Sequence, residues 1–151
     1  MDVKTIVALS KHPNIVGMKE SSGDIAKISE IVAATHEHDD FFVLAGSANF
    51  LLPALKVGAI GGICALANAL PEEVCQLQQL LDEGKEGEAL SLHYRLLAPN
   101  KAVTAQFGVP GLKYVMDKRG YYGGPLRRPL LPFTDEAQIQ ALNNAFSANG
   151  F

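Results

Sequence analysis

The residue of this 151-residue chain best placed to do chemistry is Lys19, which directly follows the apolar run Ile15-Val16-Gly17-Met18. An unbroken apolar run of this kind is typical of a strand covered on both faces. Burial in such a strand favours a neutral lysine amine, which can attack a carbonyl carbon and form an imine. An arginine could not do this, because a guanidinium stays charged. By position alone, however, a lysine at a strand end is more often a solvated or structural residue.

The segment from Asn14 to Asp24 resembles the Schiff-base lysine motif of the dihydrodipicolinate synthase and N-acetylneuraminate lyase family. Members of this family are (β/α)8-barrel aldolases and synthases that act on pyruvate and related 2-oxo acids. The closest likeness within the family is to 4-hydroxy-2-oxoglutarate aldolase. Further segments look like the same family, in the same order along the chain: residues 42–47, 58–68, 107–113 and 120–125.

The resemblance implies a substrate site made of four residues of this chain. Lys19 matches the imine-forming lysine, and Ser21 matches the position that contacts the substrate in 4-hydroxy-2-oxoglutarate aldolase. Gly46 matches the glycine that brings backbone close to the bound oxo acid, and Ile63 matches the residue whose main chain flanks the lysine. We expect the Ile63 side chain to lie in the core. Without a ligand, residues 21–23 read equally well as a turn before a helix, and Gly46 as a tight strand-helix turn.

The activity implied by the resemblance is class I aldolase chemistry, most like cleavage of 4-hydroxy-2-oxoglutarate to pyruvate and glyoxylate. The alternatives are a dihydrodipicolinate synthase or a 2-oxo-3-deoxy sugar acid aldolase. An alternative of another class is a non-catalytic barrel fragment that associates with a full-length relative. We expect no metal and no organic cofactor, because the protonated imine itself accepts the electron pair of the reacting bond.

The resemblance also implies that part of the active site lies outside this chain. The family's proton-relaying tyrosine and its serine- or threonine-containing loop for the substrate carboxylate come from strands that precede the lysine. The tyrosines of this chain follow Lys19 and stand in no such motif: Tyr94, Tyr114, Tyr121 and Tyr122. Glu20 should point to the opposite face of the strand from Lys19, so we do not assign it as a general base. We therefore expect the isolated chain to be inactive.

Strands alternate with helices in the first two thirds of the sequence, which indicates βαβ units and a parallel sheet. The predicted strands cover residues 14–19, 41–45 and 59–65. Apolar periodicity and capping residues predict helices at residues 2–11, 24–35, 50–57, 71–84, 88–104, 110–119 and 134–147.

A complete (β/α)8 barrel needs about 250 residues, so this chain can hold only part of one. The predicted fold is the C-terminal part of a TIM barrel, with about three parallel strands in residues 1–103. Residues 104–151 are predicted to form a C-terminal helical extension. Because open strand edges expose unpaired backbone groups, we expect the isolated chain to be unstable or to associate through its sheet.

A net charge of −3 gives no reason to expect a nucleic-acid partner or an anionic membrane surface. No apolar run is long enough to cross a bilayer and no targeting segment is recognisable, which favours a cytoplasmic or mitochondrial protein. By resemblance the full-length protein is a homo-oligomer, a tetramer or a dimer. The cysteines and histidines form no metal-binding pattern: Cys64 is expected in a buried strand and Cys75 in a helix, His12 and His93 at the surface or at a cap, and His36 and His38 at a helix end.

Overall fold

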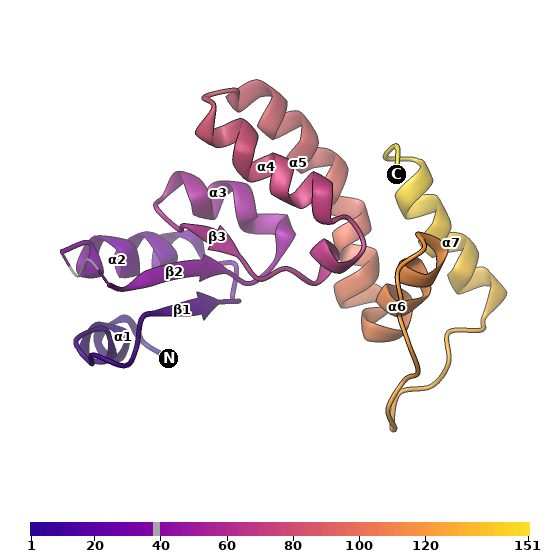
Figure 1. The fold of residues 1–151 in the computed structure, drawn as a ribbon, viewed down its shortest axis with the longest axis horizontal. Coiled ribbons are helices and arrows are strands. Elements are labelled where there is room, and N and C mark those ends of the chain that lie inside the picture. Colours follow the sequence, from indigo (N-terminus) through magenta and orange to yellow (C-terminus); the bar gives the residue numbers. More distant parts are fainter. Residues whose placement is uncertain (38–39) are drawn as a thin grey trace. The chain divides into compact units, whose positions relative to one another are not determined.

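The computed structural model describes residues 1–37 and 40–151, which form two compact units, residues 1–64 and 65–151. Figure 1 labels the elements of both units. The first unit contains α1 (Val3–Ser10), β1 (Gly17–Glu20), α2 (Ile25–Thr35), β2 (Phe42–Ala45), the 3₁₀ turn η1 (Ala48–Phe50), α3 (Leu51–Lys56) and β3 (Gly61–Gly62).

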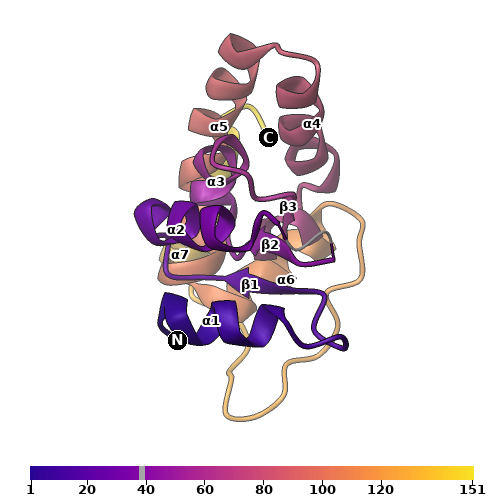
Figure 2. The same ribbon diagram turned by 90° about the vertical axis from the view of Figure 1, so that its left-hand side faces the viewer.

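The three strands of the first unit form one parallel sheet in the order β1-β2-β3. Lys19 pairs with Leu44, and Leu44 pairs with Gly61, so the carboxyl ends of all three strands lie at the same edge. Helix α2 connects β1 to β2, and α3 connects β2 to β3. Right-handed crossovers of this kind place both helices on the same face of the sheet, as Figure 2 shows. This is the predicted βαβ arrangement.

Aspartates begin the helices that cover the sheet. The Asp2 carboxylate accepts the Thr5 amide at 2.7 Å, and the Asp24 carboxylate accepts the Lys27 amide at 3.0 Å. Each bond satisfies an amide that the first helical turn leaves without an intrahelical acceptor. Helix α2 then buries Ile28 and Ile31 completely. The predicted cap and apolar face of α2 are therefore confirmed.

The strands are covered on one face only, so the prediction that β1 is covered on both faces is wrong for the described residues. Val43 and Ala45 are buried, whereas Val16 is 65% exposed. Lys19 is also exposed. The physical reason is that both helical crossovers pack on the same face, which leaves the opposite face of the sheet uncovered within this unit. An apolar run shows that a strand is suited to burial, but not which residues bury it.

The second unit is helical. Its elements are the 3₁₀ turn η2 (Ala65–Asn68), α4 (Pro71–Asp82), α5 (Glu86–Lys101), the π-helical turn η3 (Ala102–Gln106), α6 (Gly108–Lys118) and α7 (Glu136–Ser147). Helices α4 and α5 form a hairpin around Gly84, whose φ of 73° is a left-handed conformation that favours glycine. Leu77, Leu96 and Leu142 are fully buried in this unit. All predicted helices are present, with ends shifted by a few residues.

The prediction that His93 lies at the surface is wrong. Only 8% of His93 is exposed, because it lies on the buried stripe of α5 together with Ala89 and Leu96. These positions are four residues before and three residues after His93, so they share one helical face. His36 follows the end of α2, and its partner in the predicted pair, His38, lies outside the described residues.

Candidate active site

The candidate residues meet at the carboxyl edge of the sheet, where each strand passes into the following turn. The Gly46 amide donates to the Glu20 carbonyl at 2.7 Å, and the Ile63 amide donates to the Ala45 carbonyl at 2.8 Å. These bonds extend the ladder by one residue beyond each strand. They hold residues 20–21, 45–46 and 62–63 at one level, as expected for the functional edge of a parallel α/β sheet.

Ser21 and Gly46 lie in direct contact. A Cβ atom added to Gly46 would lie 2.8 Å from the Glu20 carbonyl oxygen and 2.8 Å from the Ser21 Cβ. Real Cβ atoms do not approach other atoms this closely, so only glycine lets the two turns pack together. The structure therefore brings Ser21 and Gly46 side by side, as the sequence predicts for a shared site.

Lys19 lies near the end of β3 as well as in β1. The positive charge of Lys19 acts on the thiol of Cys64, although the two residues are separated by the whole of β2. Burial raises the pKa of the Cys64 thiol to about 11, and the Lys19 charge opposes this rise only in part. Cys64 is thus a neutral neighbour of the lysine at neutral pH. Sequence reasoning placed Cys64 in a buried strand but gave no signal that it lies next to Lys19.

The Ile63 side chain does not lie in the core, contrary to our expectation. It is 53% exposed, while the next residue, Cys64, is only 7% exposed. Successive side chains in extended backbone point to opposite faces, and Ile63 points away from the face that α3 covers. Its main chain remains part of the sheet ladder through the bond to Ala45.

Glu20 follows Lys19 directly but is buried, with 6% of its surface exposed. Its carboxylate accepts bonds from the Ser22 amide at 2.8 Å and the Ser22 hydroxyl at 2.6 Å. Lys27 of α2 forms an ion pair with the other carboxylate oxygen at 3.2 Å. Burial acts to raise the pKa of the Glu20 carboxyl, but the bonds from Ser22 and Lys27 outweigh it and hold the pKa below the ordinary value. Glu20 is therefore an anion that faces away from Lys19, as its place in the strand predicts.

The described residues contain no group of three or more His, Cys, Asp or Glu side chains that could hold a metal ion. In the same described part of the chain, no helix is both long and apolar enough to cross a membrane.

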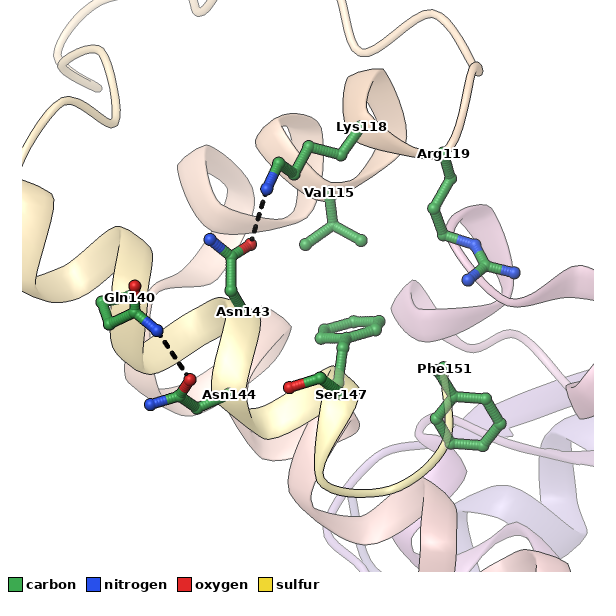
Figure 3. Close-up of a pocket in the computed structure, with 9 residues that line it drawn as sticks. Val115, Lys118, Arg119, Gln140, Asn143, Asn144, Ser147 and Phe151 are labelled. Atoms are coloured by element: carbon green, nitrogen blue, oxygen red, sulfur yellow. Dashed lines mark hydrogen bonds between the residues drawn. The ribbon is translucent and has the colours of Figure 1, made fainter.

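A pocket of about 340 Å³ lies between α6 and α7 in the second unit, apart from every candidate residue. Figure 3 shows Lys118 bonded to the Asn143 side chain at 3.2 Å. The other cation of the pocket, Arg119, forms an ion pair with Glu73 at 3.6 Å. Lysine and arginine at a helix C-terminus also complement the helix dipole, so the structure explains both charges without a ligand.

A smaller pocket in the first unit lies at the amino ends of the strands. It is lined by residues around the start of β2 and the end of α2, including Thr35, Phe41 and Ile60. The candidate residues lie at the opposite, carboxyl edge. Parallel α/β folds place their active sites at the carboxyl edge, so we do not assign a substrate to this pocket.

Comparison with known proteins identifies the family. The model of the dihydrodipicolinate synthetase family matches residues 1–148 of the chain. The chain belongs to this family. Its three-stranded parallel sheet and helices are accordingly part of a (β/α)8 barrel, and the enzymes of the dihydrodipicolinate synthetase family are lyases.

Individual relatives agree with the family model. The 4-hydroxy-tetrahydrodipicolinate synthase of Methanosphaerula palustris is 38% identical over 125 residues, covering 83% of this chain and 43% of the relative. The enzyme of the same name from Listeria innocua is 35% identical over 152 residues, covering 97% of this chain and 50% of the relative. The crystal structure of a dihydrodipicolinate synthase from Bacillus anthracis has a TM-score of 0.88 at 29% identity, over 97% of this chain and 49% of that one.

Two points follow from these relatives of the dihydrodipicolinate synthetase family. The chain spans about half the length of the relatives it matches. The relatives are also named as synthases, so the expected closer likeness to 4-hydroxy-2-oxoglutarate aldolase is not supported. The motif around Lys19 is shared across the family, which is why the sequence alone identified the family but misjudged the member.

Proposed function

We propose that this chain supplies the imine-forming lysine and part of the pyruvate site of a dihydrodipicolinate synthase. The observation that carries the proposal is the position of Lys19. Its side chain is exposed at the carboxyl edge of the sheet, and Ser21 and Gly46 lie in contact at the same edge. This edge is where the side chains of a (β/α)8 barrel act on substrate.

The first chemical step is addition of the Lys19 amine to C2 of pyruvate. Loss of water then leaves a protonated imine, in which the positive nitrogen withdraws electrons from the neighbouring methyl carbon. Removal of a methyl proton gives an enamine, and the enamine carbon forms a bond to the carbonyl carbon of a second substrate. Hydrolysis of the imine returns the amine of Lys19 and releases the product. The imine carries the charge throughout, so the sequence requires no metal.

The name of the relatives' product indicates the second substrate. A 4-hydroxy-tetrahydrodipicolinate has seven carbons, one ring nitrogen and two carboxylates. Pyruvate supplies three of the carbons and one carboxylate. By balance, the partner is a four-carbon amino acid that carries an aldehyde, and closing the ring through its amine releases one water.

The proton transfers require a residue that this chain has not placed near Lys19. Glu20 is buried on the other face, and all four tyrosines belong to residues 65–151. We infer that the proton relay and the carboxylate-binding loop come from the remaining strands of the barrel. A positioned acid or base contributes about 10²–10⁴-fold to rate, so the 151-residue chain alone should form the imine but turn over slowly or not at all.

Cleavage of 4-hydroxy-2-oxoglutarate is a second candidate, and the position of Ser21 favours it. Ser21 is exposed beside Gly46 and could bond the hydroxyl of such a substrate. Both reactions start from the same imine and differ only in the second carbonyl compound. In the complete barrel, faster consumption of pyruvate with the four-carbon amino aldehyde than with glyoxylate supports the synthase, and the reverse order supports the aldolase.

A non-catalytic role as the partner of a full-length relative is favoured by two observations. The chain spans half the length of its relatives, and its sheet is open on one face. For the complete enzyme we propose a homo-oligomer, a dimer or a tetramer, in the cytoplasm, with residues 104–151 as its C-terminal helical extension. The relatives give no support to a mitochondrial location.

The proposal is tested by trapping the imine in the 151-residue chain. Pyruvate and borohydride should add one reduced pyruvate to the intact chain, measured by mass spectrometry. Lys19→Arg keeps the positive charge but cannot form an imine, so it should abolish the adduct. Lys4→Arg changes an exposed lysine of α1 and serves as the matched control. An adduct that persists in Lys19→Arg at the level of Lys4→Arg would refute the proposal.

A further inference from the structure

Glu20 is the most strongly bonded charged group near the candidate site, and the proposed chemistry does not use it. It is 6% exposed, and it lies between the catalytic strand and helix α2. A buried carboxylate is costly unless its oxygens are bonded. Here each oxygen has a partner, two bonds from Ser22 on one and Lys27 on the other.

These bonds fix the turn that carries Ser21. The Glu20 carboxylate reaches over Ser21 to hold both the amide and the hydroxyl of Ser22. The Ser22 hydroxyl in turn accepts the Asp24 amide at 3.2 Å, and Asp24 caps α2 at Lys27. The Glu20 carbonyl accepts the Gly46 amide from the neighbouring turn. One residue therefore ties together the strand, the Ser21 turn, the start of α2 and the Gly46 turn.

We propose that Glu20 is a positioning residue for the 2-oxo acid, acting through the turn that it holds. By fixing Ser22, it presents the Ser21 side chain at the carboxyl edge beside Gly46, on the side where Lys19 receives pyruvate. Lys27 balances the charge of Glu20, so the carboxylate does not repel an anionic substrate. Preorganised polar groups of this kind lower the cost of ordering a site when the substrate binds. This inference rests on the proposed imine function of Lys19.

The test compares pyruvate with acetone as imine partners of Lys19. Both are small ketones, but only pyruvate carries a carboxylate for a preorganised polar turn to recognise. Adduct formation with borohydride is measured against ketone concentration in the wild-type chain and in Glu20→Gln, which keeps the size of the side chain but removes its charge. We expect Glu20→Gln to raise the half-saturating pyruvate concentration about tenfold, the effect of losing a bond to a charged group. Trapping of acetone should be unchanged.

Three further variants separate positioning from folding. Ser22→Ala removes the hydroxyl bond and should reproduce part of the pyruvate effect. Lys27→Met removes the balancing charge but leaves the Ser22 bonds, and it should weaken pyruvate capture through repulsion, an effect that added salt reduces. Glu20→Asp restores the charge and should recover part of the pyruvate preference. Amide exchange at Ser22 should quicken in Glu20→Gln, which reports the loosened turn directly.

The outcomes are distinguishable. If the wild-type chain forms no pyruvate adduct, the imine function and this inference both fail. If the wild type forms the adduct and Glu20→Gln retains the same pyruvate dependence, only the positioning role is overturned. An equal loss of pyruvate and acetone trapping in Glu20→Gln would show that Glu20 serves the fold alone, and would also overturn it.

Discussion

At the scale of single residues, the same physical effect produces opposite outcomes at two buried ionisable groups. Glu20 is buried and stays charged, because bonds from Ser22 and Lys27 replace its hydration. His93 is buried with no partner for its Nδ1 atom in the described part of the chain. Burial alone lowers the pKa of His93 and favours the neutral ring. The number of bonding partners, rather than burial itself, decides which charge is retained.

The unpaired histidine predicts a pH dependence of stability. The pKa of His93 is lower in the folded chain than its ordinary value of 6.5. The unfolded chain therefore takes up the proton first as pH falls, so the stability is complete above pH 6.5 and declines below it. We expect the urea midpoint of the wild type to fall between pH 7.5 and pH 5, above the range in which Glu20 titrates.

His93→Leu is the variant that isolates this effect. It fills a similar volume on the buried stripe of α5 and removes the titrating ring and its unpaired nitrogen. Its urea midpoint should change less between the two pH values than that of the wild type. An unchanged slope in His93→Leu would assign the pH dependence to other groups.

At the scale of elements, the site is built by turns that pack more closely than side chains allow. The contact between the Ser21 and Gly46 turns joins β1 to β2 exactly where each strand ends. Gly46 is needed there for space, since its backbone angles are not in the left-handed region. The sequence pattern predicts the strand and the turn, but the contact depends on the sheet register, which apolar periodicity does not determine.

Gly46→Ala should separate the two turns. The added methyl group overlaps the Glu20 carbonyl and the Ser21 side chain, and overpacking of this kind costs about 1–3 kcal/mol. We expect a lower free energy of unfolding, measured with urea, and a weaker pyruvate adduct. Gly87→Ala is the control, because Gly87 lies in α5 with nothing within 4 Å of an added Cβ atom. It should leave the adduct unchanged and stabilise the chain by up to about 1 kcal/mol. Equal behaviour of the two variants would contradict this account of the turns.

Predictions of element type succeed and predictions of coverage fail, for a single physical reason. Periodicity and caps are local, so α2 starts after Asp24 as predicted. Coverage depends on distant or absent partners, so Ile63 is exposed although its apolar character suits a core. His93 fails in the opposite direction, because a polar side chain on the buried face of α5 is covered by its neighbours. The contacts of Glu20 with Ser22 and Lys27 could not be foreseen from spacing alone.

At the scale of the whole molecule, the first unit presents a sheet that is incomplete by the standards of its family. Within the described residues, β1 and β3 each pair with β2 alone, so each has one unpaired edge. Apolar residues beside these edges remain exposed, with Val16 at 65% and Ile60 at 55%. Unpaired edges and exposed apolar residues both favour pairing with another chain.

The 151-residue chain should therefore self-associate. Light scattering after size-exclusion chromatography should give a mass above 16.1 kDa that rises with concentration. Val16→Lys places a charge beside the open edge of β1 and should shift the chain toward the monomer. A compact monomer at every concentration, in both the wild type and Val16→Lys, would show that the open sheet does not drive association.

The most direct test of the central claim is to locate the reduced pyruvate adduct by peptide mapping. After treatment with pyruvate and borohydride, the chain is digested and the modified lysine is identified by tandem mass spectrometry. The account predicts that the modification lies on Lys19, in the peptide that contains Ser21 and Ser22. A modification spread evenly over the exposed lysines, with no preference for Lys19, would contradict it.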